Sequence, residues 1–152
     1  MTWKNKSTKK NILSARIRQF YFFIEKRVCF ISKKILIIDD SNTIRQQVSF
    51  VLKKGGYQVI EAENGLMGIK ILKEEPDISL VICDVNMPEM NGLTMVKVIN
   101  ESNDIQHPPI LILTTEASAE SMAEAKKYGA KGWIVKPFNP EMLIEGIKKL
   151  LA

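Results

Sequence analysis

The chain has 152 residues, of which 45% are apolar and 26% are charged. Such a length and composition are typical of one globular domain that buries its core without disulfides or metals. Its two cysteines, Cys29 and Cys83, lie far apart without CxxC or histidine spacing. This argues against a disulfide framework or a zinc site and is typical of a reducing, cytoplasmic compartment, in which we expect Cys83 to pack as a small apolar side chain.

Positive charge is concentrated at the N-terminus. The formal net charge is +5, but residues 1–31 hold eight Lys or Arg against one acid, and the remaining residues hold 14 basic and 16 acidic side chains. The body of the protein is therefore mildly acidic, and nothing in it indicates nucleic-acid binding.

We expect two parts, a basic extension over residues 1–32 that is disordered or partly helical, and a folded domain over 33–152. The apolar run "FYFFI" (20–24) is too short to span a membrane, and no small-residue cleavage site indicates a secretory signal. Three interpretations of the extension stay open: a disordered or partly docked segment, a basic amphipathic helix that contacts anionic lipid, or a true translation start near "ISKKILIIDD" (31–40).

From Lys33 onward, short apolar runs alternate with stretches of helical character. Several runs are nearly continuous in β-branched residues or leucine, as in parallel strands that are covered on both faces. The expected strands are 34–39, 57–62, 78–84, 110–114 and 132–136, and the expected helices are 41–56, 65–74, 93–101, 118–128 and the residues from 140 on. Ser41 suits a helix cap and Pro140 a first helical turn. Five strands alternating with five helices predict a doubly wound α/β fold with a parallel sheet.

Acidic residues follow two of the expected strands. Asp39 and Asp40 end the first strand, and Asp84 ends the third. Ligand sites of such sheets lie at the carboxyl ends of the strands. Three acids brought together there would repel one another, and a hard divalent cation such as Mg²⁺ relieves the repulsion. The sequence therefore predicts a magnesium site at this edge.

Two other strands end in polar side chains that suit the same edge. Lys136 follows the fifth strand, and we expect it to pair with Asp84 and later to hold a phosphoryl oxygen as a point charge. The Lys136–Pro137 bond is a candidate cis peptide. Thr114 ends the fourth strand and offers a hydroxyl that can donate to an anion.

Four motifs along residues 33–152 resemble the receiver domain of two-component response regulators, a five-stranded, flavodoxin-like fold. They are "IIDDS" (37–41), "CDVNMPEMNG" (83–92), "ILTTEA" (112–117) and "GWIVKPF" (132–138), in order and at the spacing of the family.

The resemblance implies a role for each strand-end residue. Asp84 would be the phosphoacceptor, attacking the phosphorus of a phosphohistidine on a sensor histidine kinase or a histidine phosphotransfer domain. Asp39, Asp40, Asp84 and the backbone carbonyl of Asn86 would hold Mg²⁺. Thr114 and Lys136 would contact the phosphoryl group.

The resemblance also implies a switch and a control of phosphate lifetime. Trp133 stands where the family usually has Tyr or Phe, an aromatic side chain that swings inward as Thr114 is drawn to the phosphoryl group. Because Trp is larger than either ring, we expect a partial swing; the alternative is a static Trp at the surface. Asn86 and Glu116 occupy the positions that tune the lifetime of the aspartyl phosphate and resemble the pair of fast-decaying chemotaxis regulators. Asn91 stands where the loop often has Asp, a change that suits a turn.

We expect a phosphoacceptor switch with self-phosphorylation and self-dephosphorylation activity only, not a dedicated enzyme. The last expected helix ends the chain, so its output would be a protein contact through the fourth helix, fifth strand and fifth helix, with chemotaxis or motility as one setting.

Two alternatives stay open. A Mg²⁺-dependent aspartyl-nucleophile phosphohydrolase would have a DxDx[TV] motif, where this chain has "CDVNM" (83–87) and no cap over a substrate pocket. A receiver-like scaffold that is never phosphorylated would be expected to lack a pocket residue, and none is missing.

Overall fold

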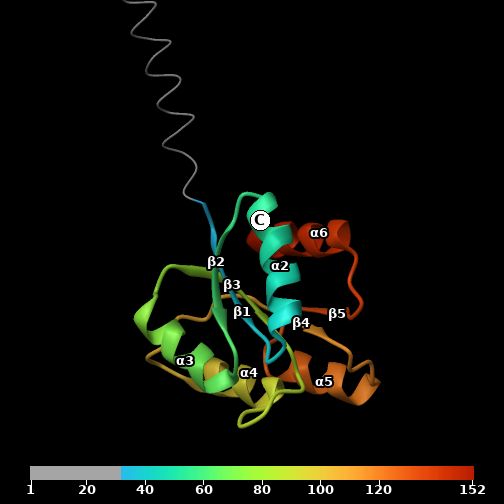
Figure 1. Cartoon of the computed structure of the whole chain (residues 1–152). Coiled ribbons are helices and arrows are strands. Elements are labelled where there is room, and N and C mark those ends of the chain that lie inside the picture. The colour runs from blue at the N-terminus through green and yellow to red at the C-terminus, as the bar shows by residue number, and fades with distance from the viewer. Residues whose placement is uncertain (1–31) are drawn as a thin grey trace, which may run out of the picture. The chain divides into compact units, whose positions relative to one another are not determined.

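A computed structural model describes residues 32–152. The extension predicted for residues 1–32 falls almost wholly outside this range and stays a prediction. Residues 33–152 form one compact unit, in which strands and helices alternate from its first residues to its last (Figure 1). In chain order they are β1 (Lys34–Ile38), α2 (Asn42–Lys54), β2 (Gln58–Ala62), α3 (Gly65–Glu74), β3 (Ile78–Cys83), α4 (Gly92–Glu101), β4 (Ile110–Thr114), α5 (Ala119–Lys127), β5 (Gly132–Val135) and α6 (Pro140–Leu151).

The five strands form one parallel sheet in the order β2-β1-β3-β4-β5. This confirms the predicted doubly wound α/β fold. Four predicted strands were one residue too long. Three ran too far at the carboxyl end, because Asp39, Asp84 and Lys136 come just after the last paired residues, and the second began one residue too early, at Tyr57. The side chains of Asp39, Asp84 and Lys136 therefore lie at the carboxyl edge of the sheet, just beyond the paired residues of the strands.

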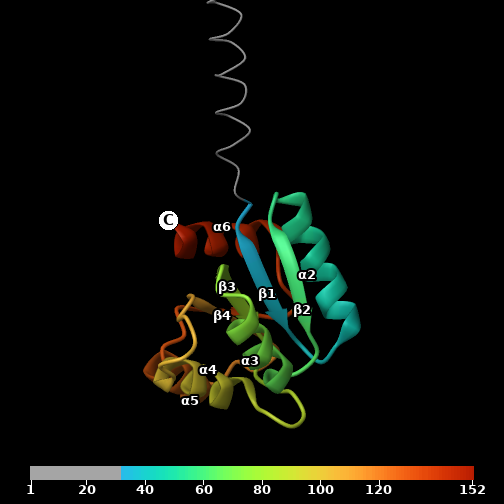
Figure 2. The same cartoon turned by 90° about the vertical axis from the view of Figure 1, so that its left-hand side faces the viewer.

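Helices cover both faces of the sheet, with α2 and α6 on one side and α3, α4 and α5 on the other (Figures 1 and 2). Successive side chains of each strand point to opposite faces of the sheet, so each strand contributes to two hydrophobic cores, one on each face. On β1, Ile35 and Ile37 pack with α2 and α6, while Leu36 and Ile38 pack toward α3, α4 and α5. Cys83 is fully buried in the second of these cores, as expected of a small apolar side chain.

A side-chain cap begins each helix. Ser41 Oγ accepts a hydrogen bond from the Ile44 amide at 3.4 Å, as predicted. The other caps are Asn64, Asn91, Ser118 and Asn139, each accepting from an amide of its own first turn. Each cap satisfies an amide that the helix leaves without an internal partner, so the short loops after the strands turn directly into helices.

The loop geometry agrees with two further expectations. The Lys136–Pro137 peptide is cis, and Pro140 occupies the first turn of α6. Within residues 32–152, no helix is both long enough and apolar enough to cross a membrane.

Candidate functional site

The predicted acids gather at the carboxyl edge of the sheet. Asp39 follows β1 and Asp84 follows the adjacent strand β3, and the Asp84 amide donates to the Ile38 carbonyl at 2.9 Å. Asp39, Asp40 and Asp84 each present a carboxylate oxygen within 4.8 Å of the others. Asp39 and Asp84 are buried, with 3% and 7% of their surface exposed, whereas Asp40 is exposed. The site therefore combines two buried acids with one that faces solvent.

Lys136 bridges the two buried acids. Its Nζ lies 2.6 Å from Asp39 Oδ2 and 3.2 Å from Asp84 Oδ2. The contact with Asp84 was predicted, but the shorter contact with Asp39 was not. The cluster thus holds three carboxylates and one ammonium, which contacts two of them, so acids outnumber the positive charge.

Burial and charge act against each other within this cluster. Burial raises the pKa of Asp39, and the hydrogen bonds from Lys136 and from the Ser41 amide (2.8 Å) oppose this increase. Burial alone would lower the pKa of Lys136, but its hydrogen bond with Asp39 and the charge of Asp84 raise that pKa above its ordinary value. Lys136 is therefore a permanent positive charge in the site at physiological pH.

The loop after β4 brings Thr114, Glu116 and Trp133 together. The fully buried Thr114 accepts a hydrogen bond at Oγ1 from the Glu116 amide, at 3.2 Å. The half-buried Trp133 donates from its indole Nε1 to the Glu116 carbonyl, also at 3.2 Å. Glu116 thus connects the threonine to the aromatic ring through both of its backbone polar groups.

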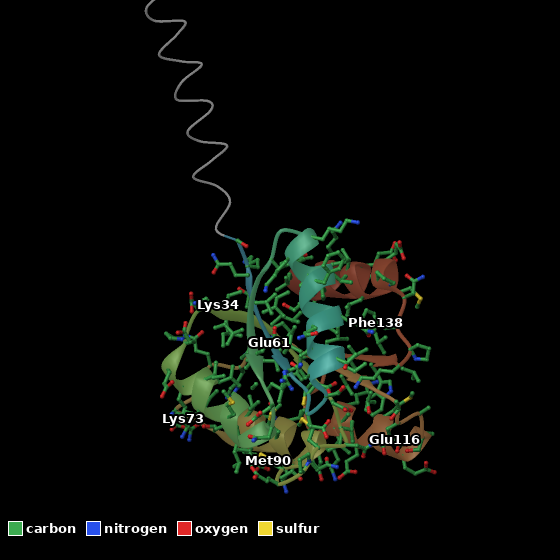
Figure 3. The ribbon with its side chains drawn as sticks, viewed as in Figure 1. Lys34, Glu61, Lys73, Met90, Glu116 and Phe138 are labelled. Atoms are coloured by element: carbon green, nitrogen blue, oxygen red, sulfur yellow. The ribbon has the colours of Figure 1, made fainter. Side chains whose placement is uncertain are left out.

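The carboxylate of Glu116 is turned toward the start of α5 (Figure 3). Its Oε1 accepts a hydrogen bond from the Ser118 amide at 2.8 Å, and the bonds to Ser118 lower the pKa of the carboxyl. This hydrogen bond turns the side chain to Ser118 rather than to Asp84, so the lifetime-tuning role of Glu116 stays a prediction. Asn86 lies closer to Asp84: it is exposed, and its backbone amide donates to Asp84 Oδ1 at 3.3 Å.

The loop after β3 folds back tightly on Asp84 and Val85 at the end of that strand. The Gly92 amide donates to the Val85 carbonyl at 2.8 Å, and a Cβ at Gly92 would lie 2.0 Å from the Asp84 carbonyl oxygen. No side chain fits there, so this glycine is needed for the close approach of two backbone segments. Asn91, whose side chain accepts from the Leu93 amide at 2.8 Å, caps α4 and shows why Asn serves where Asp is more usual.

The donor set fits a hard divalent cation. Three carboxylates within reach of one another, one of them open to solvent, match the preference of Mg²⁺ for a few carboxylates, a carbonyl and retained waters. The lone lysine leaves room for a further positive charge.

Two residues of the site were not predicted. Arg45 contacts the backbone of Asp39, and Gly92 allows the close approach of the loop after β3 to Asp84. The place of Arg45, one turn into the helix that follows Asp39 and Asp40, is a signal in the sequence that could have indicated its role. The glycine, eight positions after Asp84, could have indicated the second.

Comparisons with known proteins agree with this geometry. The family model of the response regulator receiver domain matches residues 35–148. The chain is 40% identical to the chemotaxis protein CheY1 of Helicobacter pylori over 120 residues, covering 78% of this chain and 97% of that protein. It is 39% identical to the chemotaxis protein CheY-3 of Vibrio cholerae over 118 residues, covering 77% of this chain and 90% of the relative.

Solved structures extend the likeness to three dimensions. The chemotaxis protein CheY4 of Vibrio cholerae superposes with a TM-score of 0.74 at 42% identity, covering 79% of this chain and 99% of the other. A response regulator receiver domain protein of Clostridium thermocellum gives a TM-score of 0.72 at 31% identity, covering 78% and 94%. Three of these four relatives are chemotaxis proteins. The chain thus belongs to the family of response regulator receiver domains, which act as signalling switches.

Proposed function

We propose that the protein is a response regulator that accepts a phosphoryl group on Asp84 from a sensor histidine kinase or a histidine phosphotransfer domain. One observation carries the proposal. The buried Asp84 carboxylate ends a strand beside the surplus acids Asp39 and Asp40 and in contact with Lys136. A purely structural acid would not need this costly arrangement of like charges.

The residues of the chain divide the transfer among them. A carboxylate oxygen of Asp84 attacks the phosphorus of the phosphohistidine; the O–P bond forms as the P–N bond breaks, and the leaving imidazole nitrogen keeps the electron pair. Lys136 holds a phosphoryl oxygen as a fixed positive charge. The Thr114 hydroxyl accepts from the Glu116 amide, so its own proton is directed elsewhere and is suited to donate to the phosphoryl group.

Mg²⁺ belongs to the same proposal. Asp39, Asp40, Asp84 and the carbonyl of Asn86 would hold the ion, which would neutralise the charge of the carboxylates and of the incoming phosphoryl oxygens.

The same proposal covers the signal and its decay. Movement of Thr114 toward the phosphoryl group would pull on Glu116 and so on the indole of Trp133, which alters the surface beside it. We expect a downstream protein contact on the α5, β5 and α6 face. A hollow of about 450 Å³, lined by Met122, Lys126 and Trp133 among others, supports the α5 and β5 part of this face. We expect Asn86 and Glu116 to tune rapid self-dephosphorylation.

Intact mass spectrometry after incubation with Mg²⁺ and acetyl phosphate tests the proposal. We expect one phosphoryl adduct that is labile to hydroxylamine and absent from Asp84→Asn and from samples with EDTA. The Asp77→Asn variant, which removes an acid at the other edge of the sheet, should retain the adduct. A folded wild type that forms no adduct would contradict the proposal and favour a scaffold. Multiple turnover of a small phosphate ester would instead favour a phosphohydrolase.

A further inference from the structure

Arg45 joins three segments that come together beside the acid cluster. Its Nη1 donates to the Asp39 carbonyl at 2.7 Å, and its Nη2 lies 3.3 Å from Asn42 Oδ1. Its Nε lies 3.4 Å from Glu61 Oε2 on β2. The arginine side chain is only 13% exposed, so these bonds form in a largely desolvated place. A planar guanidinium with donors in a fixed fork is suited to hold all three partners at once.

The contact with Asp39 is to its carbonyl, not to its carboxylate. That carbonyl belongs to the peptide unit that leads into Asp40, so its direction also sets where Asp40 points. The other groups of Asp39 have partners elsewhere: its amide donates to Ala62, and its carboxylate accepts from Ser41 and Lys136. The backbone carbonyl of Asp39 takes no part in these bonds, and Arg45 is the residue that holds it.

Glu61 in turn fixes Arg45. It lies on β2 beside α2 (Figure 3), and in the register of the sheet it pairs with Ile37, two residues before Asp39. The guanidinium is therefore held by the rigid sheet, through Glu61, as well as by helix α2, which carries Arg45. A second-layer residue of this kind orients metal ligands without touching the metal.

We propose that Arg45, anchored by Glu61, is a positioning residue that fixes the Asp39–Asp40 peptide and so holds Asp40 in place to bind a divalent cation together with Asp39 and Asp84. This inference rests on the proposed function, because the positioning of Asp40 matters to the protein only if the site binds Mg²⁺. It adds to that function two residues that do not touch the phosphoryl group.

Charge and positioning predict opposite results when Arg45 is removed. If the arginine acted only as a positive charge near a cation site, Arg45→Met would bind Mg²⁺ more tightly, because a repulsion is lost. If it positions Asp40, the same variant binds Mg²⁺ more weakly despite the lost repulsion. Arg45→Lys sharpens the distinction, because it keeps the charge but loses the fork.

The test is a Mg²⁺ titration of the full chain followed by isothermal calorimetry. We expect Arg45→Met and Arg45→Lys each to raise the Kd by about tenfold, as for other second-layer residues of metal sites. Glu61→Gln should raise the Kd less. The double variant with Arg45→Met should have nearly the same Kd as Arg45→Met alone, because the glutamate acts through the arginine. Lys73→Met, which removes a remote ion pair with Asp104 of 2.9 Å, is the matched control and should leave the Kd unchanged.

A second readout needs neither metal nor phosphoryl donor. The Asp39 amide donates to Ala62 and the Ser41 amide donates to the Asp39 carboxylate, so their hydrogen exchange in the metal-free protein reports the order of the loop. We expect faster exchange at both amides in the two Arg45 variants and no change in Lys73→Met.

The outcomes separate the two proposals. Tighter or unchanged Mg²⁺ binding in Arg45→Met, or a Lys variant equal to wild type, would overturn the positioning role while the phosphoryl adduct on Asp84 remains. A wild type that binds no Mg²⁺ and takes no phosphoryl group would overturn the proposed function. In that case, unchanged hydrogen exchange at the two amides in the Arg45 variants would also overturn the positioning of the loop by Arg45. Faster exchange there would support this positioning.

Discussion

Two lysines hold two carboxylates each at opposite edges of the same sheet. At the carboxyl edge, Lys136 lies 2.6 and 3.2 Å from Asp39 and Asp84. At the amino edge, Lys34 lies 2.7 and 2.8 Å from Glu75 and Asp77. Distances alone would not separate the two clusters.

Burial and the number of acids do separate them. The side chains of the Lys136 cluster are all under a tenth exposed, and a third acid, Asp40, lies within reach. Glu75 and Asp77 have side chains that are 43% and 64% exposed, so water and salt screen their charges. Buried carboxylates with a further acid beside them therefore indicate a functional site, whereas a close ion pair by itself does not.

Removal of each lysine should give the largest difference between the clusters. Without Mg²⁺, we expect Lys136→Met to lower the free energy of unfolding by about 3 kcal/mol, because it leaves two buried carboxylates without a neutralising positive charge. Lys34→Met should have a much smaller effect. Urea unfolding at pH 7 measures both. Equal stability of Lys136→Met and wild type would mean that the buried acids are already neutral in the metal-free fold.

Mg²⁺ should stabilise only the carboxyl edge. At a free concentration one hundred times the Kd, binding to the native state alone adds about 2.7 kcal/mol to the free energy of unfolding. We expect this gain to be lost in Asp40→Asn and retained in Asp77→Asn, as followed by urea unfolding with and without the ion. A gain that survives in Asp40→Asn would place the cation somewhere other than the acid cluster.

The two clusters should also respond oppositely to loss of an acid. Burial raises the pKa of Asp39, whereas the hydrogen bond with Lys34 lowers the pKa of Asp77. An acid with a raised pKa stabilises the fold fully below its unfolded pKa, and this contribution is lost as the pH rises through the folded pKa. For a lowered pKa the contribution is present above the unfolded value and is lost as the pH falls through the folded one.

Substitution by asparagine tests these signs. At pH 7 without Mg²⁺, Asp39→Asn should raise the free energy of unfolding and Asp77→Asn should lower it. The gain for Asp39→Asn should shrink as the pH is lowered toward 4, near the ordinary pKa of an aspartate. Urea unfolding across this range measures the difference from wild type, and the same sign for both variants would contradict the comparison.

Much of the carboxyl edge was predictable from the sequence. Apolar runs that alternate with helices predicted the parallel sheet, and the parallel sheet brings strand ends together at one edge. The convergence of Asp39, Asp84 and Lys136 follows from these two steps without any knowledge of their contacts. The one-residue errors at strand ends have a simple cause, since a sequence shows which residues are apolar but not which backbone groups are paired.

The remaining contacts depend on geometry that a sequence does not carry. The ammonium of Lys136 has several rotatable bonds, so its shorter distance to Asp39 depends on how the loop after β5 is turned. Trp133 and Arg45 both donate to backbone carbonyls, and such acceptors look alike at every position of the sequence. The need for Gly92 arises from a close approach to Asp84 that only the folded loop creates.

Salt should give the smallest but most specific difference between the clusters. The Debye length falls from about 10 Å at 0.1 M salt to about 3 Å at 1 M, and exposed charges are screened far more than buried ones. We therefore expect the small loss of stability in Lys34→Met to disappear in 1 M NaCl, while the loss in Lys136→Met persists. Urea unfolding of both variants at the two salt concentrations provides the measurement. If salt removed both losses alike, the Lys136 cluster would be open to solvent ions, and the contrast in burial between the two edges would not govern their energetics.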